Sequence, residues 1–294
     1  MRARITCWGT RGTSPAPGPH TFRYGGHTAC VEVRFADGTR VVFDAGSGLR
    51  LLGHTLDAAN ERASARSRTR VPLILTHRHS DHVIGLAPFA AHVAGTHDID
   101  ISCPGVEVEA LRALVMQQLS EPLFPHIDGV LSAVRVSAFD ARGERTIGET
   151  GRVLALPAHH PGGASILRAA DADGLLLAYA PDNELHLDAS DDLSVHWRAM
   201  LAEALHGVPV LLHDATYTHD ELPAHRGWGH SSAEEATRFA IMCNARMLLL
   251  FHHHPDRRDE AVDAMVARCA ALAAAAGSTL RVAAAADGGE YDIA

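Results

Sequence analysis

The stretch Thr76-His77-Arg78-His79-Ser80-Asp81-His82 places three imidazoles and one carboxylate within six consecutive residues. His77 and His79 share one side of an extended backbone, because side chains alternate with a period of two. Asp81 and His82 follow where the chain turns, so they can point back to the same cavity from another angle. This ligand set suits zinc, iron or manganese. Chance histidines in a polar turn are the alternative in a chain with 21 of them, but four ligand-type side chains rarely share one turn.

The flanking residues predict how this stretch is held. An apolar run, 71–75, precedes it and is typical of a buried strand, and the run 83–90 reads as the start of a helix. The candidate ligands therefore lie on a strand-to-helix turn. The long loop 9–28, rich in Gly, Pro and Thr, is either a wall of the site mouth or a plain surface loop.

The remaining pattern alternates strands and helices along the chain. Residues 29–36 and 40–44 predict a hairpin, because Asp37-Gly38 between them is a strong turn signal. The run 61–70 carries four arginines, and we interpret it as a solvated connector rather than a nucleic-acid contact. Further strands are expected at 1–8, 97–102, within 133–181, and at 208–213, 246–251 and 280–286, the last of the chain; helices are expected at 49–59, 105–120, 191–206, 232–243 and 257–275.

The His-rich stretch resembles the HxHxDH motif of the metallo-β-lactamase-fold hydrolases. Four other segments resemble the rest of that family's pattern and come in the expected order: Phe43-Asp44-Ala45-Gly46, His159-His160-Pro161-Gly162-Gly163, Ala180-Pro181-Asp182 and Phe251-His252-His253-His254-Pro255. The resemblance covers nearly the whole chain. It implies one domain over residues 1–294 with the fold class α/β, a four-layer αββα sandwich of two sheets between helices.

The resemblance also implies a dinuclear metal site. His77, His79 and His160 would hold one ion, Asp81, His82 and His252 would hold the other, and Asp182 and a hydroxide would bridge them. Zinc is the first expectation, with manganese or iron as alternatives, because His/Asp sites accept all three. His160 is preferred over His159 because it directly precedes Pro-Gly-Gly, and His252 over His253 and His254 because it comes first after a strand. Asp44 is expected to orient a ligand histidine.

A narrower likeness concerns the segments around Asp214 and His230. His213-Asp214-Ala215-Thr216-Tyr217 and Gly229-His230-Ser231-Ser232 are similar to segments of the tRNase Z branch, which includes small cyclic-nucleotide phosphodiesterases. This likeness implies that His230 protonates a leaving alkoxide while Asp214 holds its tautomer and raises its pKa. A buried structural hydrogen bond between them is the alternative.

Chain length and charge favour a small substrate. The tRNA processors of this branch carry a long basic arm between the third histidine and the bridging aspartate, whereas here only 22 positions separate His160 from Asp182 (182 − 160). The net charge of −9 argues against long nucleic acid. We therefore expect a small phosphodiester, first a cyclic nucleotide, with Arg11, Arg23 and Tyr24 as candidate substrate contacts.

Three other functions compete with this one. An acyl hydrolase acting on a lactone, thioester or β-lactam could use the same metal pair, although it has less need of a proton donor. A redox di-iron protein of this fold usually has an acidic residue where this chain has His79, and a flavin domain that 294 residues do not accommodate. A non-catalytic regulator commonly loses metal ligands that this chain keeps.

Composition sets the remaining expectations. Hydrophobic residues make up 47% of the chain, which is enough for a sizeable core, and neither a signal peptide nor a membrane span is predicted. The five cysteines are odd in number and scattered, as in reduced thiols of a cytoplasmic protein. A homodimer is expected because two-fold dimers are the commonest assembly.

Overall fold

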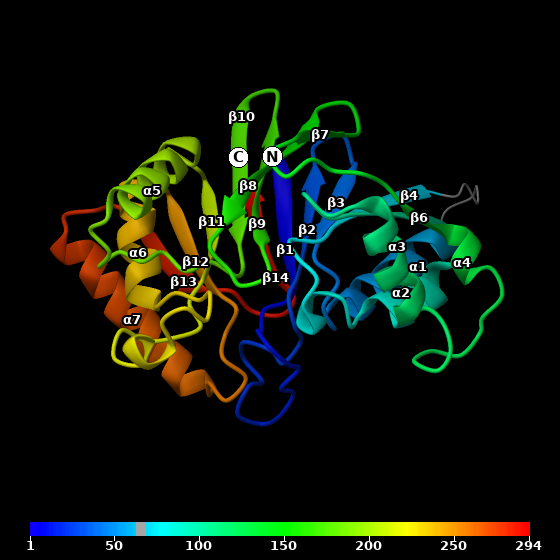
Figure 1. The fold of residues 1–294 in the computed structure, drawn as a ribbon, viewed down its shortest axis with the longest axis horizontal. Helices are drawn as coiled ribbons and strands as arrows, with labels where there is room; N and C mark the ends of the chain where they lie inside the picture. Colours follow the sequence, from blue (N-terminus) through cyan, green and yellow to red (C-terminus); the bar gives the residue numbers. More distant parts are fainter. Residues whose placement is uncertain (63–68) are drawn as a thin grey trace.

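Two seven-stranded sheets lie face to face in the computed structural model, which describes residues 1–62 and 69–294 (Figure 1). The first sheet is built mainly from the N-terminal half of the chain. Its strands are, in spatial order, β14 (Gly289–Ile293), β1 (Ala3–Gly9), β2 (Cys30–Phe35), β3 (Arg40–Phe43), β4 (Thr69–Ile74), β5 (His97–Ser102) and β6 (Val134–Val136).

The second sheet is built from the C-terminal half. Its strands are, in spatial order, β13 (Arg281–Ala284), β12 (Met247–Phe251), β11 (Val210–Asp214), β10 (Gly174–Ala180), β9 (Ala164–Asp171), β8 (Gly151–Ala158) and β7 (Glu144–Ile147).

Helices cover the outer face of each sheet. Those on the first sheet are α1 (Leu49–Arg62), α2 (Leu86–Val93), α3 (Val108–Gln118) and α4 (Val130–Ala133). Those on the second are α5 (Asp192–Ala204), α6 (Ala233–Met242) and α7 (Asp259–Ala275). The predicted four-layer αββα sandwich is confirmed.

Apolar side chains fill three layers of this sandwich. The central layer joins the two sheets and includes Val31, Val33, Leu167, Leu177 and Phe251, all fully buried. Two outer layers lie under the helices. Because strands such as β11 and β12 are covered on both faces, they contain continuous apolar runs, Val210 to Leu212 in β11 and all of β12, rather than alternating apolar residues.

Local signals in the sequence account for several boundaries. The predicted hairpin is present as β2 and β3, which pair antiparallel around the Asp37-Gly38 turn. Helix α6 starts at the expected Ser cap, where the Ser232 hydroxyl accepts a hydrogen bond from the Glu235 amide at 3.1 Å.

The prediction that the segment 280–286 ends the fold is wrong, because β14 follows it and pairs antiparallel with β1. This strand was missed because its residues are mostly polar. Two of them, Glu290 and Asp292, form ion pairs with Arg4 across the strand pair, at 2.9 and 2.7 Å.

Two sequence expectations concern the remaining surface. The arginine-rich connector falls largely on residues 63–68, which lie outside the described residues. Among the described helices, none has both the length and the apolar character to cross a bilayer.

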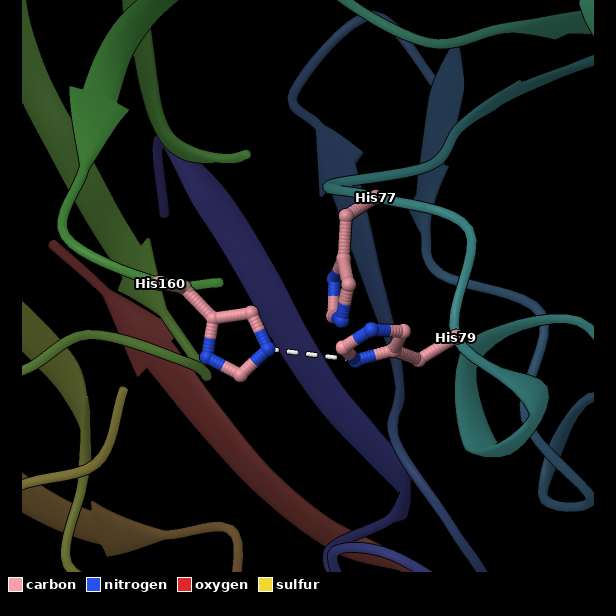
Figure 2. Close-up of side chains that lie close together, drawn as sticks. All are labelled: His77, His79 and His160. Atoms are coloured by element: carbon pink, nitrogen blue, oxygen red, sulfur yellow. Dashed lines mark hydrogen bonds between the residues drawn. The ribbon is translucent and has the colours of Figure 1, made fainter. Parts of the chain in front are cut away.

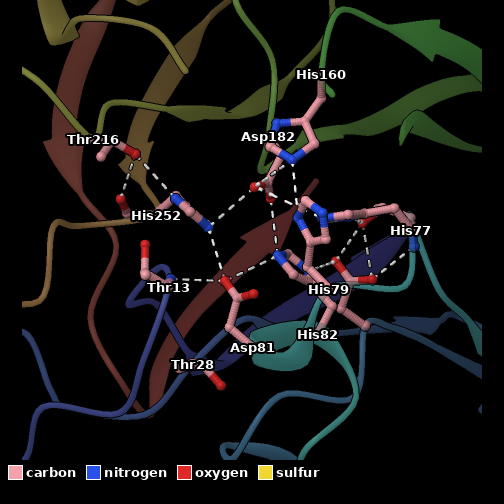
Figure 3. Close-up of polar contacts among 12 residues, drawn as sticks. Thr13, Thr28, His77, His79, Asp81, His82, His160, Asp182, Thr216 and His252 are labelled. Carbon is pink, nitrogen blue, oxygen red and sulfur yellow. Dashed lines mark hydrogen bonds and ion pairs between the residues drawn. The ribbon is translucent and has the colours of Figure 1, made fainter. Parts of the chain in front are cut away.

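The parallel strands determine where a site can form. Strands β3 to β6 run parallel in the first sheet, and β10 to β13 run parallel in the second. The loops that follow β4, β10, β11 and β12 carry His77, Asp182, Thr216 and His252, and these residues meet at one edge of the sandwich (Figure 3). Ligands of α/β sheets characteristically bind at the carboxyl ends of such strands.

Candidate metal centre and adjoining acid

Three histidines converge from two elements to form the first part of the site. His77 and His79 come from the turn after β4, and His160 comes from the loop after β8 (Figure 2). The ring centroid of His77 lies 4.5 Å from that of His79 and 4.9 Å from that of His160. His160 Nε2 and His79 Nδ1 are 3.1 Å apart. One nitrogen of each ring can therefore face a common point.

A second group lies beside the first. Asp81 and His82 belong to the 3₁₀ turn η1 (Ser80–His82), and His252 follows β12. Asp81 Oδ2 is 3.3 Å from His82 Nε2 and 3.2 Å from His252 Nε2 (Figure 3). Within the described residues, this trio and the histidine trio both have the spacing of metal ligands.

Asp182 lies between the two groups. One of its oxygens, Oδ1, is 3.8 Å from His160 Nε2 and 3.4 Å from His252 Nε2. The other, Oδ2, is 3.0 Å from His82 Nε2. A carboxylate in this position can bind to both groups at once, so all seven predicted metal ligands lie together.

The outer nitrogens of the ligand rings are held by specific partners, which turns the inner nitrogens toward the cluster. The Nδ1–H of His160 donates to the Gly229 carbonyl at 3.0 Å, and that of His252 donates to the Thr216 hydroxyl at 3.0 Å. His77 Nδ1 lies 3.1 Å from the Thr76 hydroxyl. Partners of this kind fix the tautomer and orientation of a metal-binding imidazole.

Asp44 directly follows β3 and contacts His82, Thr76 and Tyr179. Its Oδ2 is 2.8 Å from His82 Nδ1 and accepts a hydrogen bond from the Tyr179 hydroxyl at 3.0 Å. Its Oδ1 accepts from the Thr76 amide at 2.7 Å. Asp44 has a φ of 60° and His252 a φ of 57°, a region that non-glycine residues seldom occupy. Backbone strain of this kind tends to gather at functional sites.

Three inner atoms of the cluster lack hydrogen-bond partners. His77 Nε2, His82 Nε2 and Asp182 Oδ2 are buried, and none of them makes a geometrically acceptable hydrogen bond, although the last two are 3.0 Å apart. Buried polar atoms are normally paired. Lone pairs that converge without pairing are what a divalent cation requires, so these residues fit a metal centre.

The charges of the cluster agree with this conclusion. Burial alone would lower the pKa of His82, but Asp44, Asp182 and Asp81 raise it well above the usual histidine value. Burial alone would raise the pKa of Asp182, but the rings of His252, His82 and His77 hold it well below its usual range. The field that favours a proton on His82 also favours a divalent cation there.

Asp214 and His230 form a pair beside the cluster. Asp214 ends β11 and is fully buried, while His230 comes just before α6. The Nδ1–H of His230 donates to Asp214 Oδ2 at 2.7 Å. Burial alone would lower the pKa of His230, but Asp214 contributes most to raising it to about 9. The ring of His230 stacks at 4.9 Å on that of His252, so a protonated imidazole lies next to the candidate metal ligands.

The neighbouring histidines of the two runs lie elsewhere. His159 stacks on Trp197 at 3.7 Å, and the buried His253 ring donates from Nε2 to the Ala285 carbonyl at 2.9 Å. His254 is half-buried and lines a separate cavity. The structure thus places His160 and His252 among the ligands and leaves the other three outside.

The three predicted substrate contacts are not brought to the site. Arg11 is fully buried, and its guanidinium donates to the carbonyls of Gly25, His254 and Arg257. Arg23 and Tyr24 both hydrogen-bond to Asp263 of α7. These side chains join the loop 9–28 to the body of the fold, so their assignment to substrate is corrected.

Several residues of the site were not identified from the sequence. The Thr13 amide donates to Asp81 Oδ2 at 2.8 Å, so the loop 9–28 does touch the cluster. The Thr216 hydroxyl donates to Asp214 at 2.9 Å while it accepts from His252. Glu184 accepts from the amides of Gly227 and Gly229 and so holds the segment before His230. Thr216 and Glu184 each lie two positions after a predicted site aspartate, which was the available signal.

The geometry agrees with comparisons to known proteins. A family model described as the beta-lactamase superfamily domain matches residues 39–253. The solved structure of the metallo-beta-lactamase fold protein YhfI from Bacillus subtilis aligns with a TM-score of 0.70 at 18% identity over 99% of both chains. The short form of human tRNase Z aligns at 0.63 and 18% identity, also over 99% of both chains. Zn²⁺-bound PqqB from Methylobacterium extorquens aligns at 0.65 and 13% identity over 99% of this chain and 100% of that chain.

At these identities the structural likeness shows a shared fold and nothing more specific. No curated protein sequence matches the chain.

Proposed function

The chain belongs to the metallo-beta-lactamase superfamily, and on this premise we propose that it is a metal-dependent hydrolase of a small phosphodiester, with His230 as the general acid. A cyclic nucleotide is the first choice of substrate. Two divalent ions are proposed, zinc first, with manganese or iron as alternatives.

The pairing of His230 with Asp214 is the observation that carries this proposal. A phosphodiester with an alkoxide leaving group needs a proton at the leaving oxygen, and a general acid must hold that proton at working pH. The 2.7 Å contact with the buried Asp214 carboxylate stabilises the protonated form of His230, and Asp214 contributes most to raising the pKa of this ring. An acid that stands beside metal ligands has the position this reaction requires.

The chain's own residues divide the remaining work. His77, His79 and His160 would hold one ion, and Asp81, His82 and His252 the other, with Asp182 common to both. Divalent ions held there supply Lewis acidity and lower the pKa of a water. When a water gives up a proton to solvent, its oxygen bonds to phosphorus and the bond to the leaving oxygen breaks, the Nε2 proton of His230 would pass to the leaving oxygen. Asp214 stabilises the imidazolium beforehand and keeps its ring in place.

The short segment between His160 and Asp182 supports a small substrate. It holds only β9 and β10 with a tight turn between Asp171 and Gly174, and it carries no inserted arm. The net charge of −9 further opposes a grip on a long polyanion. A single phosphodiester needs no basic surface, because the proposed metal ions would neutralise its one negative charge.

Hydrolysis of bis(p-nitrophenyl) phosphate by protein loaded with zinc or manganese tests the proposal, with a lactone as the comparison substrate. We expect phosphodiester turnover that a chelator abolishes, and no lactone opening. Lactone opening without phosphodiester turnover by the metal-loaded protein would overturn the proposal in favour of an acyl hydrolase.

A further inference from the structure

A cavity of about 600 Å³ lies next to the site but is lined by none of the metal ligands. Its size falls within the range of about 300–1,000 Å³ that is usual for small-molecule pockets. Its walls come from the loop after β11, the segment after β12 and the first turn of α7: Tyr217, Glu221, His225, His254, Asp256, Arg257, Arg258, Glu260 and Ala261.

Aromatic rings form one wall of this cavity. Tyr217 and His225 stack face to face, with centroids 4.2 Å apart and an interplanar angle of 15°. The His225 ring is fixed because its Nδ1–H donates to the Glu221 carbonyl at 2.9 Å. Trp228, which is 61% exposed, is not a lining residue, but its ring supports His225 from outside the cavity, with the two ring centroids 5.0 Å apart. Ring faces held in this way suit a planar aromatic group, which stacks on them.

The aromatic wall leads directly to the proposed acid. The Tyr217 ring lies 6.1 Å from the His230 ring and 6.2 Å from that of His254. His254 in turn is only two positions after the ligand His252. In the proposed reaction His230 faces the leaving oxygen, so the sugar that bears this oxygen extends on this side.

Resting on the proposed function, we propose that this cavity binds a nucleobase, the planar aromatic group carried by the sugar that bears the leaving oxygen. The substrate would then place its phosphate at the metal centre and its ring against His225, which the buried Tyr217 ring supports from behind.

The charges around the cavity favour a neutral ring over a further phosphate. Three carboxylates, Glu221, Asp256 and Glu260, face two guanidinium groups, Arg257 and Arg258. Arg257 is already engaged, because it donates to Glu221 Oε2 at 2.6 Å and to the Thr216 carbonyl at 3.0 Å. The Arg257 hydrogen bond holds the pKa of Glu221 at about 2, so that carboxylate stays ionised. A second anionic group would meet an excess of negative charge here.

Calorimetric titration of the zinc-loaded protein with adenosine 5′-monophosphate and with ribose 5-phosphate tests the proposal. Both ligands carry the same phosphate and sugar, and only the first carries a base. Base stacking favours binding, so we expect the nucleotide to bind at least about fivefold more tightly. His225→Ala should remove most of this preference and leave ribose 5-phosphate binding unchanged.

Two further variants make the result specific. His54→Ala removes an exposed histidine of α1 that contacts another histidine ring at 4.5 Å, and it should keep the full preference. Trp228→Ala alters an exposed side chain, so it tests the wall even where His225→Ala does not fold, and it should weaken nucleotide binding alone. Equal affinities of the wild-type protein for the two ligands, or an unchanged preference in His225→Ala and Trp228→Ala, would overturn the proposal.

This outcome is separable from the proposed reaction. Base-dependent binding by a protein that opens lactones would retain the cavity assignment and discard the phosphodiesterase. Hydrolysis of bis(p-nitrophenyl) phosphate without any preference for the base would do the reverse.

Discussion

Gly12 packs against the ring of His252, and its replacement by alanine tests how closely that ligand must be positioned. A Cβ at position 12 would lie 2.1 Å from His252 Cε1 and 2.2 Å from Nδ1, whereas ordinary contact begins at 3.4 Å. One of the two groups must therefore move by about 1.3 Å (3.4 − 2.1). The ring is the group under strain, because the Gly12 backbone is itself fixed by a hydrogen bond to the His253 carbonyl at 3.0 Å.

A displacement of this size exceeds what a metal ligand tolerates. Ligand distances must fall within about 0.2 Å of their ideal values. Loss of the orienting contact between His252 and Thr216 alone is expected to cost about 10–100-fold in metal affinity. We therefore expect Gly12→Ala to weaken the ion at Asp81, His82 and His252 by at least about tenfold, with the ion at the three histidines retained.

Competition with a chromophoric chelator measures this change, and native mass spectrometry counts the bound ions. Gly18→Ala is the matched control, because it makes the same substitution in the same loop at a position with no atom within 4 Å of the new Cβ. Gly12→Ala should bind one ion tightly and one weakly, while Gly18→Ala should bind both as the wild type does. Two ions bound by Gly12→Ala with wild-type affinity would refute the reasoning.

Three further changes have definite expected results. Gly229→Ala places a Cβ 2.3 Å from His160 Nδ1 at a φ of +86°, so it should weaken the ion at the other group by at least about tenfold; equal chelator competition with the wild type would contradict this. Arg11→Met leaves three partly buried carbonyls without a donor and should lower the free energy of unfolding in urea by about 3 kcal/mol. An unchanged midpoint of urea unfolding together with a raised KM would instead indicate that Arg11 binds substrate. Burial raises the pKa of Asp287 from 3.8 to about 6. Between these two pH values the folded protein holds a proton on Asp287 that the unfolded chain has released. Ionisation of the buried Asp287 carboxylate therefore has no effect on the free energy of unfolding below about pH 4. It lowers that free energy as the pH rises through about 6, by up to about 3 kcal/mol. Asp287→Asn should abolish this loss, and parallel pH profiles for the two proteins would rule it out.

The cluster of candidate metal ligands could be predicted because part of it is local and chemically distinctive and the family resemblance pointed to the rest. His77, His79, Asp81 and His82 sit on one turn, and His252 follows an apolar strand whose end is evident from the sequence. Parallel strands bring such ends to one edge without any further information. The pair of sheets was implied by the resemblance to the metallo-β-lactamase-fold hydrolases, and the apolar pattern gave only the individual strands and helices.

The contacts that orient those ligands depend on tertiary packing and could not be predicted in the same way. A threonine such as Thr216 has no unusual pattern, and only the fold brings its hydroxyl between Asp214 and His252. The left-handed backbone of His252 is likewise imposed by its surroundings. Arg11 was misassigned because an arginine in a glycine-rich loop suggests an anion contact, whereas its charge is buried among carbonyls. Strand β14 was missed because its burial is one-sided and its outer side chains are paired with Arg4.

The dependence of the His230→Ala defect on the leaving group tests the central claim most directly. The wild-type and variant rates are compared on bis(p-nitrophenyl) phosphate and on 3′,5′-cyclic adenosine monophosphate with both proteins loaded with zinc. A p-nitrophenolate departs with little help, whereas an alkoxide needs a proton, and general acids contribute about 100-fold or more. The variant should therefore lose about 100-fold or more on the cyclic nucleotide and much less on the aryl ester. An equal loss on both substrates would show that His230 holds the site together and does not deliver the proton.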